Sequence, residues 1–189
     1  MKYFKIQPDK LNSKQKKKVY WKIICYSIIL FFVFYHVNTL NGYKSEIRAG
    51  NNFEIIDCEI IGYDYKFNRS VFSYSYNKQT FKSSKKYTSS FLIIGEKYEG
   101  RLNKSNPEVA VLLLKKPIID SIKFKKSSAK VIKVISKSKG FKMITFSYNI
   151  LEKNFNRTQY VDHRLEFEVN EKVTIYYKSI KPEIAYLKY

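Results

Sequence analysis

The chain is poor in the residue types from which disulfides, metal sites and most catalytic centres are built. Only two of its 189 residues are cysteine and two are histidine. Cys25 lies within an apolar run and Cys58 lies well beyond it, so we predict no disulfide and no thiolate metal site. The sequence predicts no cofactor, and no catalytic, cofactor-binding or metal-binding residue is assigned.

Sequence signatures of enzymes are also lacking. The chain has no Gly-rich phosphate loop, no nucleophile elbow and no zinc-ligand spacing. His163 follows Asp162, which suggests an acid–base pair, but neighbours on a strand point to opposite faces of the sheet. We interpret the two as solvated polar residues and predict that the protein is not an enzyme.

Acidic residues are scarce relative to basic ones. The chain has 36 Lys and Arg against 16 Asp and Glu, a formal charge of +20, and the part after residue 40 keeps a net charge of +13. Such an excess favours anionic lipid headgroups, wall polymers or nucleic acid as neighbours. A Lys-, Asn-, Ile- and Tyr-rich composition explains the same excess without such a partner. Because only five of the basic residues are arginine, the side chain that phosphate and base recognition favours, we do not expect nucleic acid.

One uncharged segment dominates the N-terminal part. Ile23–Val37 carries no charge, and with its flanks the segment 19–40 would form a helix roughly 30 Å long, enough to cross the hydrocarbon of a bilayer. Lys22 lies near one end, where its side chain can reach the headgroups. Aromatic residues gather toward both ends, as they do at membrane interfaces. We predict a transmembrane helix over 19–40.

Two other interpretations compete with an anchor. A buried core helix would have to be apolar on all sides within a small domain. A cleaved signal peptide has the same order of basic and apolar regions. However, the exit segment 38–43 has no small-x-small cleavage pattern, and Cys25 lies too early to be a lipoprotein cysteine. We favour an uncleaved anchor, and cleavage stays open.

The charges on either side of this segment predict its orientation. Residues 1–18 form a basic tail with seven lysines against Asp9 alone, whereas 41–58 carry only Lys44 and Arg48 as basic residues. The positive-inside rule places the tail in the cytoplasm and everything after Leu40 on the far side. We predict a single-pass protein of the cell membrane with an exported C-terminal part.

The exported part contains an internal repeat. Residues 95–112 and 170–187 align without gaps at an offset of 75, with six identities in eighteen positions. We predict two tandem copies, 53–115 and 129–189, joined by a linker over 116–128. The identical residues of the first copy are Glu96, Lys97, Pro107, Glu108, Ala110 and Leu112. Recurrence of the glutamates, as Glu171 and Glu183, favours a structural role over catalysis.

Each copy has the pattern of short strands. Segments 71–76 and 144–148 alternate large apolar with small polar residues, and no window between 50 and 189 has sustained helical periodicity. We expect a hairpin connection over 149–154, and we expect Pro107 and Pro182 to break the chain before the strands that follow them. A copy of about 62 residues is marginally stable alone, so we expect the two to pack together. The predicted fold is all-β with one N-terminal transmembrane helix, followed by two tandem, small, five-stranded barrel-like or half-open sheets. Pairing of the copies into one sandwich is the alternative.

These residues resemble a widespread domain-of-unknown-function family of bacterial membrane proteins. The pattern is Tyr-x-Tyr, a hairpin, an aromatic strand and then Gly-x-x-Val-x-Val-Tyr-Tyr-x-x-x-x-Pro-x-x-Ala-x-Leu. Asn170 replaces the turn glycine in the second copy, and the first copy has residues 101–103 where Tyr-Tyr is usual. The resemblance implies a small β domain outside the membrane beside transmembrane helices, and it implies no activity. It is carried by Tyr74, Tyr76, Phe81, Gly95, Pro107, Ala110 and Leu112, and by Phe146, Tyr148, Phe155, Val173, Ile175, Tyr176, Tyr177, Pro182, Ala185 and Leu187.

The expected function is that of a single-pass, membrane-anchored, non-catalytic β module that binds another protein or organises an envelope complex. The alternative is a basic surface module for anionic lipid headgroups or wall polymers, whose binding would weaken steeply with salt. A hydrolase or nuclease built on His163 is disfavoured. The sequence identifies neither the partner nor the oligomeric state.

Overall fold

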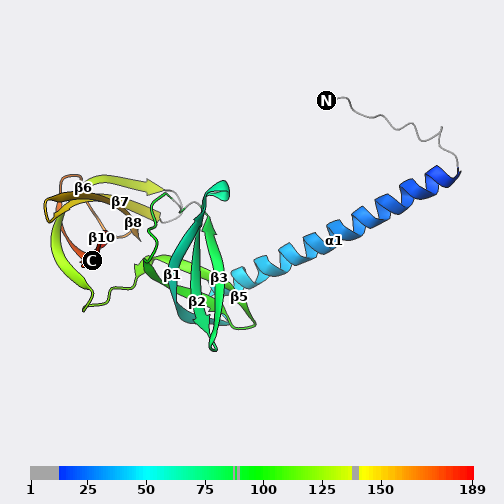
Figure 1. Cartoon of the computed structure of the whole chain (residues 1–189), viewed down its shortest axis with the longest axis horizontal. Helices are drawn as coiled ribbons and strands as arrows, with labels where there is room; N and C mark the ends of the chain where they lie inside the picture. Colours follow the sequence, from blue (N-terminus) through cyan, green and yellow to red (C-terminus); the bar gives the residue numbers. More distant parts are fainter. Residues whose placement is uncertain (1–12, 87, 89, 138–140) are drawn as a thin grey trace, which may run out of the picture. The chain divides into compact units, whose positions relative to one another are not determined.

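The computed structural model describes residues 13–86, 88, 90–137 and 141–189, so most of the predicted basic tail 1–18 lies outside the described residues. The chain divides into two compact units, Met1–Ser45 and Glu46–Tyr189. Among the described residues, the first unit consists of a helix that continues to Ala49, and the strands lie in the second unit (Figure 1).

Helix α1 runs over Ser13–Ala49. The most apolar 18-residue window within its stretch Lys17–Ala49 has a mean hydropathy of 1.9, and none of that window is buried within the protein. Among the described residues, α1 is therefore the one helix long and apolar enough to cross a membrane. This exposure argues against the core-helix interpretation, and a cleaved signal peptide stays open because it meets the same criteria. The helix continues nine residues beyond the predicted end at Leu40. It stops at Gly50, whose φ of +83° is the left-handed geometry that ends helices.

The second unit begins with an antiparallel sheet in the order β3-β2-β1-β4-β5. A single 3-10 turn, Tyr65–Phe67, joins β1 to β2. The strands follow the alternation in the sequence; on β2, for example, Phe72 and Tyr74 are buried while Ser73 and Ser75 are more exposed. The strands are β1 Phe53–Asp64, β2 Arg69–Tyr76, β3 Gln79–Lys86, β4 Lys97–Asn103 and β5 Asn106–Pro117.

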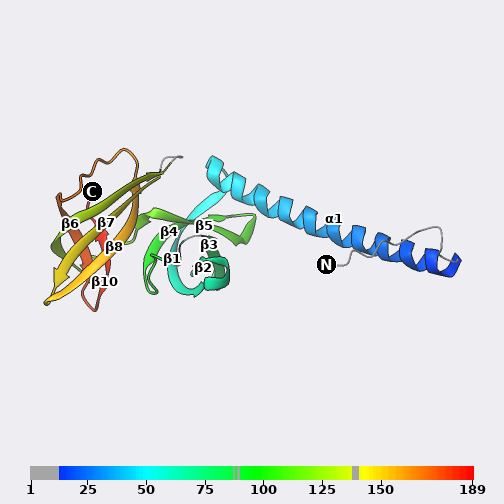
Figure 2. The same ribbon diagram turned by 90° about the horizontal axis from the view of Figure 1, so that it is seen from above.

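A second antiparallel sheet follows, in the order β10-β9-β6-β7-β8. If β6 to β10 are numbered one to five, their order is 5-4-1-2-3, which is the order of the first sheet read from its other edge. Within each sheet the edge strands approach each other, β3 toward β5 and β8 toward β10, so the first sheet curls into a half-barrel and the second into a near-barrel (Figures 1 and 2). The strands are β6 Phe124–Lys137, β7 Phe141–Ile150, β8 Lys153–Asp162, β9 Lys172–Lys178 and β10 Lys181–Leu187. The all-β prediction with one helix is confirmed.

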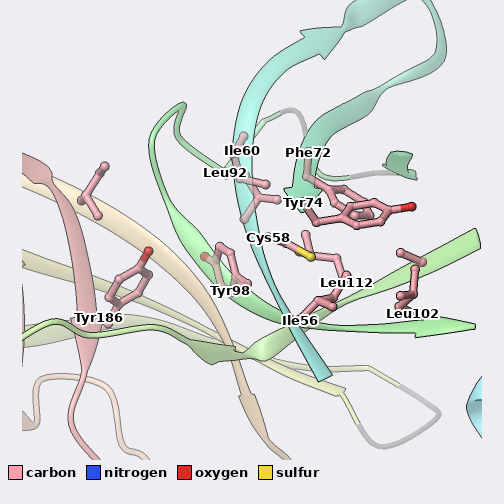
Figure 3. Close-up of a cluster of buried hydrophobic side chains, with 12 residues drawn as sticks. Ile56, Cys58, Ile60, Phe72, Tyr74, Leu92, Tyr98, Leu102, Leu112 and Tyr186 are labelled. Atoms are coloured by element: carbon pink, nitrogen blue, oxygen red, sulfur yellow. The ribbon is translucent and has the colours of Figure 1, made fainter. Parts of the chain in front are cut away.

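The two sheets share apolar packing. Tyr186 of β10 joins the core of the first sheet, where its ring meets Tyr98 edge-on at 5.9 Å between centroids (Figure 3). Ile184 belongs to the same cluster. A second cluster, built around Val131, Phe146 and other residues, fills the near-barrel. The sheets therefore pack on each other, as a copy of marginal size requires.

Three details of the sequence prediction differ from the structure. The linker predicted over 116–128 is a connection of residues 118–123, because β5 continues to Pro117 and β6 begins at Phe124. The hairpin connection predicted over 149–154 is a two-residue turn, Leu151–Glu152. Pro107 and Pro182, expected to precede strands, lie inside β5 and β10. Both are edge strands, where proline is tolerated.

Candidate functional site at the junction of the two sheets

A buried ion pair joins the two sheets. Glu96, just before β4, has a fully buried side chain, and Arg157 of β8 is 3% exposed. The Arg157 guanidinium donates to Glu96 Oε1 through Nη2 and to the Phe91 carbonyl through Nη1. The second carboxylate oxygen of Glu96 accepts the Ile93 N–H at 2.7 Å. Both charges are thus paired, whereas Arg157 Nε has no hydrogen-bond partner in the described part of the chain.

The electrostatics of the pair follow from its burial. Burial raises the pKa of the Glu96 carboxyl, while the Arg157 charge and the Ile93 N–H favour the ionised form. Burial alone would lower the pKa of Arg157, but the Glu96 charge more than offsets it and the net shift is upward. The guanidinium therefore stays charged. Each charge therefore compensates the other away from water, and the pair joins the two sheets at this point.

The turn that holds Glu96 occurs a second time, before β9. Gly95 donates its N–H to the Ile60 carbonyl at 2.8 Å, and Asn170 donates to the Val131 carbonyl at the same distance. The two residues share a positive φ, 91° and 74°. In the second turn the Glu171 carboxylate accepts the Glu168 N–H at 2.9 Å, just as Glu96 accepts that of Ile93. Asn170 can therefore occupy the position at which the family pattern has glycine, because asparagine tolerates a positive φ.

The second turn lacks the arginine. Glu171 is exposed and forms no ion pair within the described residues. The connection from β8 to β9 also carries the exposed Glu166 and Glu168, and Val169 is 55% exposed. The structure therefore presents the same carboxylate-bearing turn twice, once with a guanidinium from a packed strand and once open to solvent.

A matched pair of tyrosine contacts also occurs at equivalent places in the two sheets. Tyr74 donates its hydroxyl to the Pro107 carbonyl at 2.8 Å, and Tyr148 donates to the Pro182 carbonyl at 2.7 Å. Each ring also stacks on the aromatic residue of the next strand, at 5.7 Å and 5.5 Å between centroids. Burial raises the pKa of both hydroxyls. These residues tie the second strand of each sheet to its fifth, so their role is structural.

His163 and Asp162 do not form an isolated pair. His163 Nδ1 lies 3.4 Å from Asp162 Oδ1, but Arg164 Nε donates to the same oxygen at 2.9 Å. The hydrogen bond from Arg164 lowers the pKa of Asp162. Since the histidine side chain is 58% exposed, nothing in this arrangement positions it as a base. The absence of catalytic residues stays a prediction.

Open depressions occupy corresponding places on the two sheets. The larger, of about 590 Å³, lies over β6 and β7, and the smaller, of about 240 Å³, over β1 and β2. The described residues contain no group of three metal-ligating side chains. The larger is lined by Ser128, Ala129, Lys130, Ser147, Tyr148, Asn149, Asn154, Asn170 and Lys172, and the smaller by Asp57, Cys58, Glu59, Ser73, Tyr74, Ser75 and Lys97.

Sequence reasoning found one half of the junction. The repeat singled out Glu96 and Glu171 and favoured a structural role for both, but it did not identify an arginine as a partner. Arg157 was missed, because a lone arginine in the polar segment 153–159 carries no pattern that distinguishes it from a solvated residue. Comparisons of the chain with protein-family models, curated proteins and solved structures find no match, so the family resemblance stays a prediction.

Proposed function

We propose that this protein is a single-pass, membrane-anchored, non-catalytic interaction module whose exported β unit binds another protein. Helix α1 supplies the anchor, and the lysines of the N-terminal tail favour its retention in the cytoplasm. We infer further that the two sheets arose as a tandem repeat. Their common strand order, matched turns and matched tyrosine contacts support this origin.

The observation that carries the proposal is the open copy of the arginine-binding turn. In the first sheet this turn binds a guanidinium presented by a strand of a neighbouring sheet. In the second, the equivalent carboxylate of Glu171 is held by the Glu168 N–H and exposed beside Val169. A partner that presents an arginine from a strand, with apolar neighbours, would reproduce contacts already used within the chain. Charge-assisted pairs of this kind give specificity at interfaces.

The test is co-purification with a matched control. The full chain is extracted in mild detergent from cells that express it naturally, as wild type, as E171Q and as E152Q, which removes an exposed carboxylate elsewhere on the second sheet. We expect a stoichiometric partner with the wild type and E152Q, and its loss or at least tenfold weaker retention with E171Q. A partner retained equally by all three contradicts this site, and no partner at all contradicts the function.

The charge of +13 beyond residue 40 supports a second candidate, a basic surface module for anionic lipid headgroups or wall polymers. Binding of that kind falls steeply as salt rises, because it releases condensed counterions. A protein interface with one ion pair among apolar contacts is much less sensitive to salt, because few charges are neutralised. Measuring retention on anionic lipid vesicles and on an anionic wall polymer across a salt series therefore separates the two candidates.

A further inference from the structure

Three aliphatic side chains stand out as almost fully exposed. Ile122, Leu151 and Ile180 are 91%, 90% and 86% exposed, more than any other large apolar residue described outside α1. Each lies in a turn: Ile122 before β6, Leu151 between β7 and β8, and Ile180 between β9 and β10. Side chains as exposed as these add nothing to the hydrophobic core, and exposed aliphatic side chains lower solubility.

The strand register places all three turns at one end of the second sheet. Phe124 at the start of β6 pairs with Lys178 at the end of β9, directly before the turn with Ile180. The Ser179 N–H also donates to the Lys123 carbonyl at 2.9 Å, which ties that turn to the one with Ile122. β7 runs antiparallel to β6, so its last residue before Leu151 returns to this end. We call the three turns the apolar end.

The first sheet provides an internal control, because its equivalent turns are polar. They are formed by residues 51–52, 77–78 and 104–105, which read Asn-Asn, Asn-Lys and Lys-Ser. The comparison is closest at the second turn. Asn77 and Leu151 have φ of 48° and 50°, a left-handed geometry that asparagine tolerates and leucine does not favour. Leucine at this turn is therefore explained neither by folding nor by solubility.

The charge around the apolar end is basic. Six lysines and three carboxylates lie on the turns and the adjoining strand residues, whereas the equivalent end of the first sheet has two of each. Lys178 and Lys181 donate to the backbone carbonyls of Gly95 and Ile94, so their positive charges are not neutralised by these contacts. The lysines are Lys123, Lys125, Lys126, Lys153, Lys178 and Lys181, and the carboxylates are Asp120, Glu152 and Glu183.

We propose that the apolar end contacts the anionic bilayer in which α1 is anchored. Ile122, Leu151 and Ile180 enter the boundary between headgroups and acyl chains. The exposed Lys125, Lys126 and Lys153 bind headgroup phosphates, whereas Lys123 is paired with Asp120 at 3.2 Å. Single aliphatic residues on separate turns suit a fluid bilayer better than a protein groove, which calls for a contiguous apolar patch. The anchor supplies a high effective concentration, so a weak contact suffices. The contact leaves Glu171 free, because that residue lies at the opposite end of β9 from Ile180.

Fluorescence from matched positions tests this contact. The full chain carries C25S, because the native thiol in α1 is exposed. Cys58 is buried, and burial raises the pKa of its thiol to about 12, so it resists labelling at neutral pH. An environment-sensitive dye is attached at L151C or, as the control, at N77C in the equivalent turn. Both proteins are placed in nanodiscs of phosphatidylcholine, with or without phosphatidylglycerol.

We expect the dye at 151, but not at 77, to gain intensity severalfold in anionic nanodiscs and to be quenched by brominated acyl chains. Raising the salt, or adding I122N and I180S, should remove most of this gain. A dye at 151 that stays in water in both nanodiscs overturns the proposal, as does an equal gain at 77. Protection that appears only when a partner protein is added assigns the apolar end to that protein and also overturns it. E171Q serves as a further control that should leave the signal unchanged, so failure here is distinct from failure of the proposed function.

Discussion

Glu96 and Arg157 place two charges where water does not reach them, so the loss of either leaves the other uncompensated. We expect E96Q and R157M each to lower the free energy of unfolding of the β unit by about 3–5 kcal/mol. The double variant E96L/R157M removes both charges and should cost much less than the sum of the single changes. Urea unfolding of the full chain in detergent, followed by the β-sheet circular dichroism, measures these differences.

The exposed copy of the same turn is the control for this prediction. E171Q removes an equivalent carboxylate that has no ionic partner within the described residues, so its effect should stay within about 0.5 kcal/mol. Equal losses from E96Q and E171Q would show that the turn itself, rather than the buried pair, determines stability.

Buried phenols give the β unit a distinctive response to alkaline pH. Burial raises the pKa of Tyr74, Tyr98, Tyr148 and Tyr186, whereas in the unfolded chain these groups ionise near pH 10. Above that pH the folded state binds more protons than the unfolded state. The stability contribution is therefore complete below about pH 10 and is lost as pH rises further, by about 1.4 kcal/mol per pH unit for each tyrosine.

Urea titrations between about pH 8 and about pH 11.5 measure that slope. Y148F should flatten it by the share of one group, and it should also cost about 1 kcal/mol at neutral pH through the lost hydrogen bond to the Pro182 carbonyl. A flat profile up to pH 11.5 would contradict the assignment of these phenols as protonated in the folded state.

At the scale of single elements, we expect Leu151 to lower the stability of the turn between β7 and β8 while it allows the proposed contact with the bilayer. Leu151 occupies a left-handed position, so L151N is expected to raise the free energy of unfolding in detergent by about 1 kcal/mol. The reverse change in the equivalent turn, N77L, should lower it by a similar amount. Urea midpoints of the two variants check this, and a destabilised L151N would mean that the leucine side chain has a packing role.

The elements themselves were predictable where one physical signal decided them. The uncharged stretch 23–37 identified α1, and the alternation in 71–76 and 144–148 identified β2 and β7. Turns were harder to predict. Leu151–Glu152 has none of the residues that mark a tight turn, so a longer connection was predicted. The sequence also placed the end of β5 too early, because Lys115 to Pro117 resemble a linker although an edge strand accepts both lysine and proline.

At the scale of the whole molecule, the junction depended on packing that no local pattern encodes. The repeat at an offset of 75 predicted two similar units, and the matched strand orders agree with it. It did not predict which surfaces would meet. Because Arg157 and Tyr186 come from the second copy but complete contacts of the first, their roles appear only once both sheets are assembled.

Retention of the N-terminal segment determines whether the molecule acts as an anchored module. If α1 is an uncleaved anchor, the mature protein keeps residues 1–40, and alkaline carbonate should leave it in the membrane while detergent releases it. F32K/F34K places two charges within the apolar stretch, at about 2.5–3.5 kcal/mol each near a bilayer centre, and should shift the protein to the soluble fraction. K44Q/R48Q, which lies beyond that stretch, is the control. A mature mass that starts after residue 40 would instead make the chain a secreted protein, and the bilayer contact of the apolar end would then lose the tether on which its weak affinity relies.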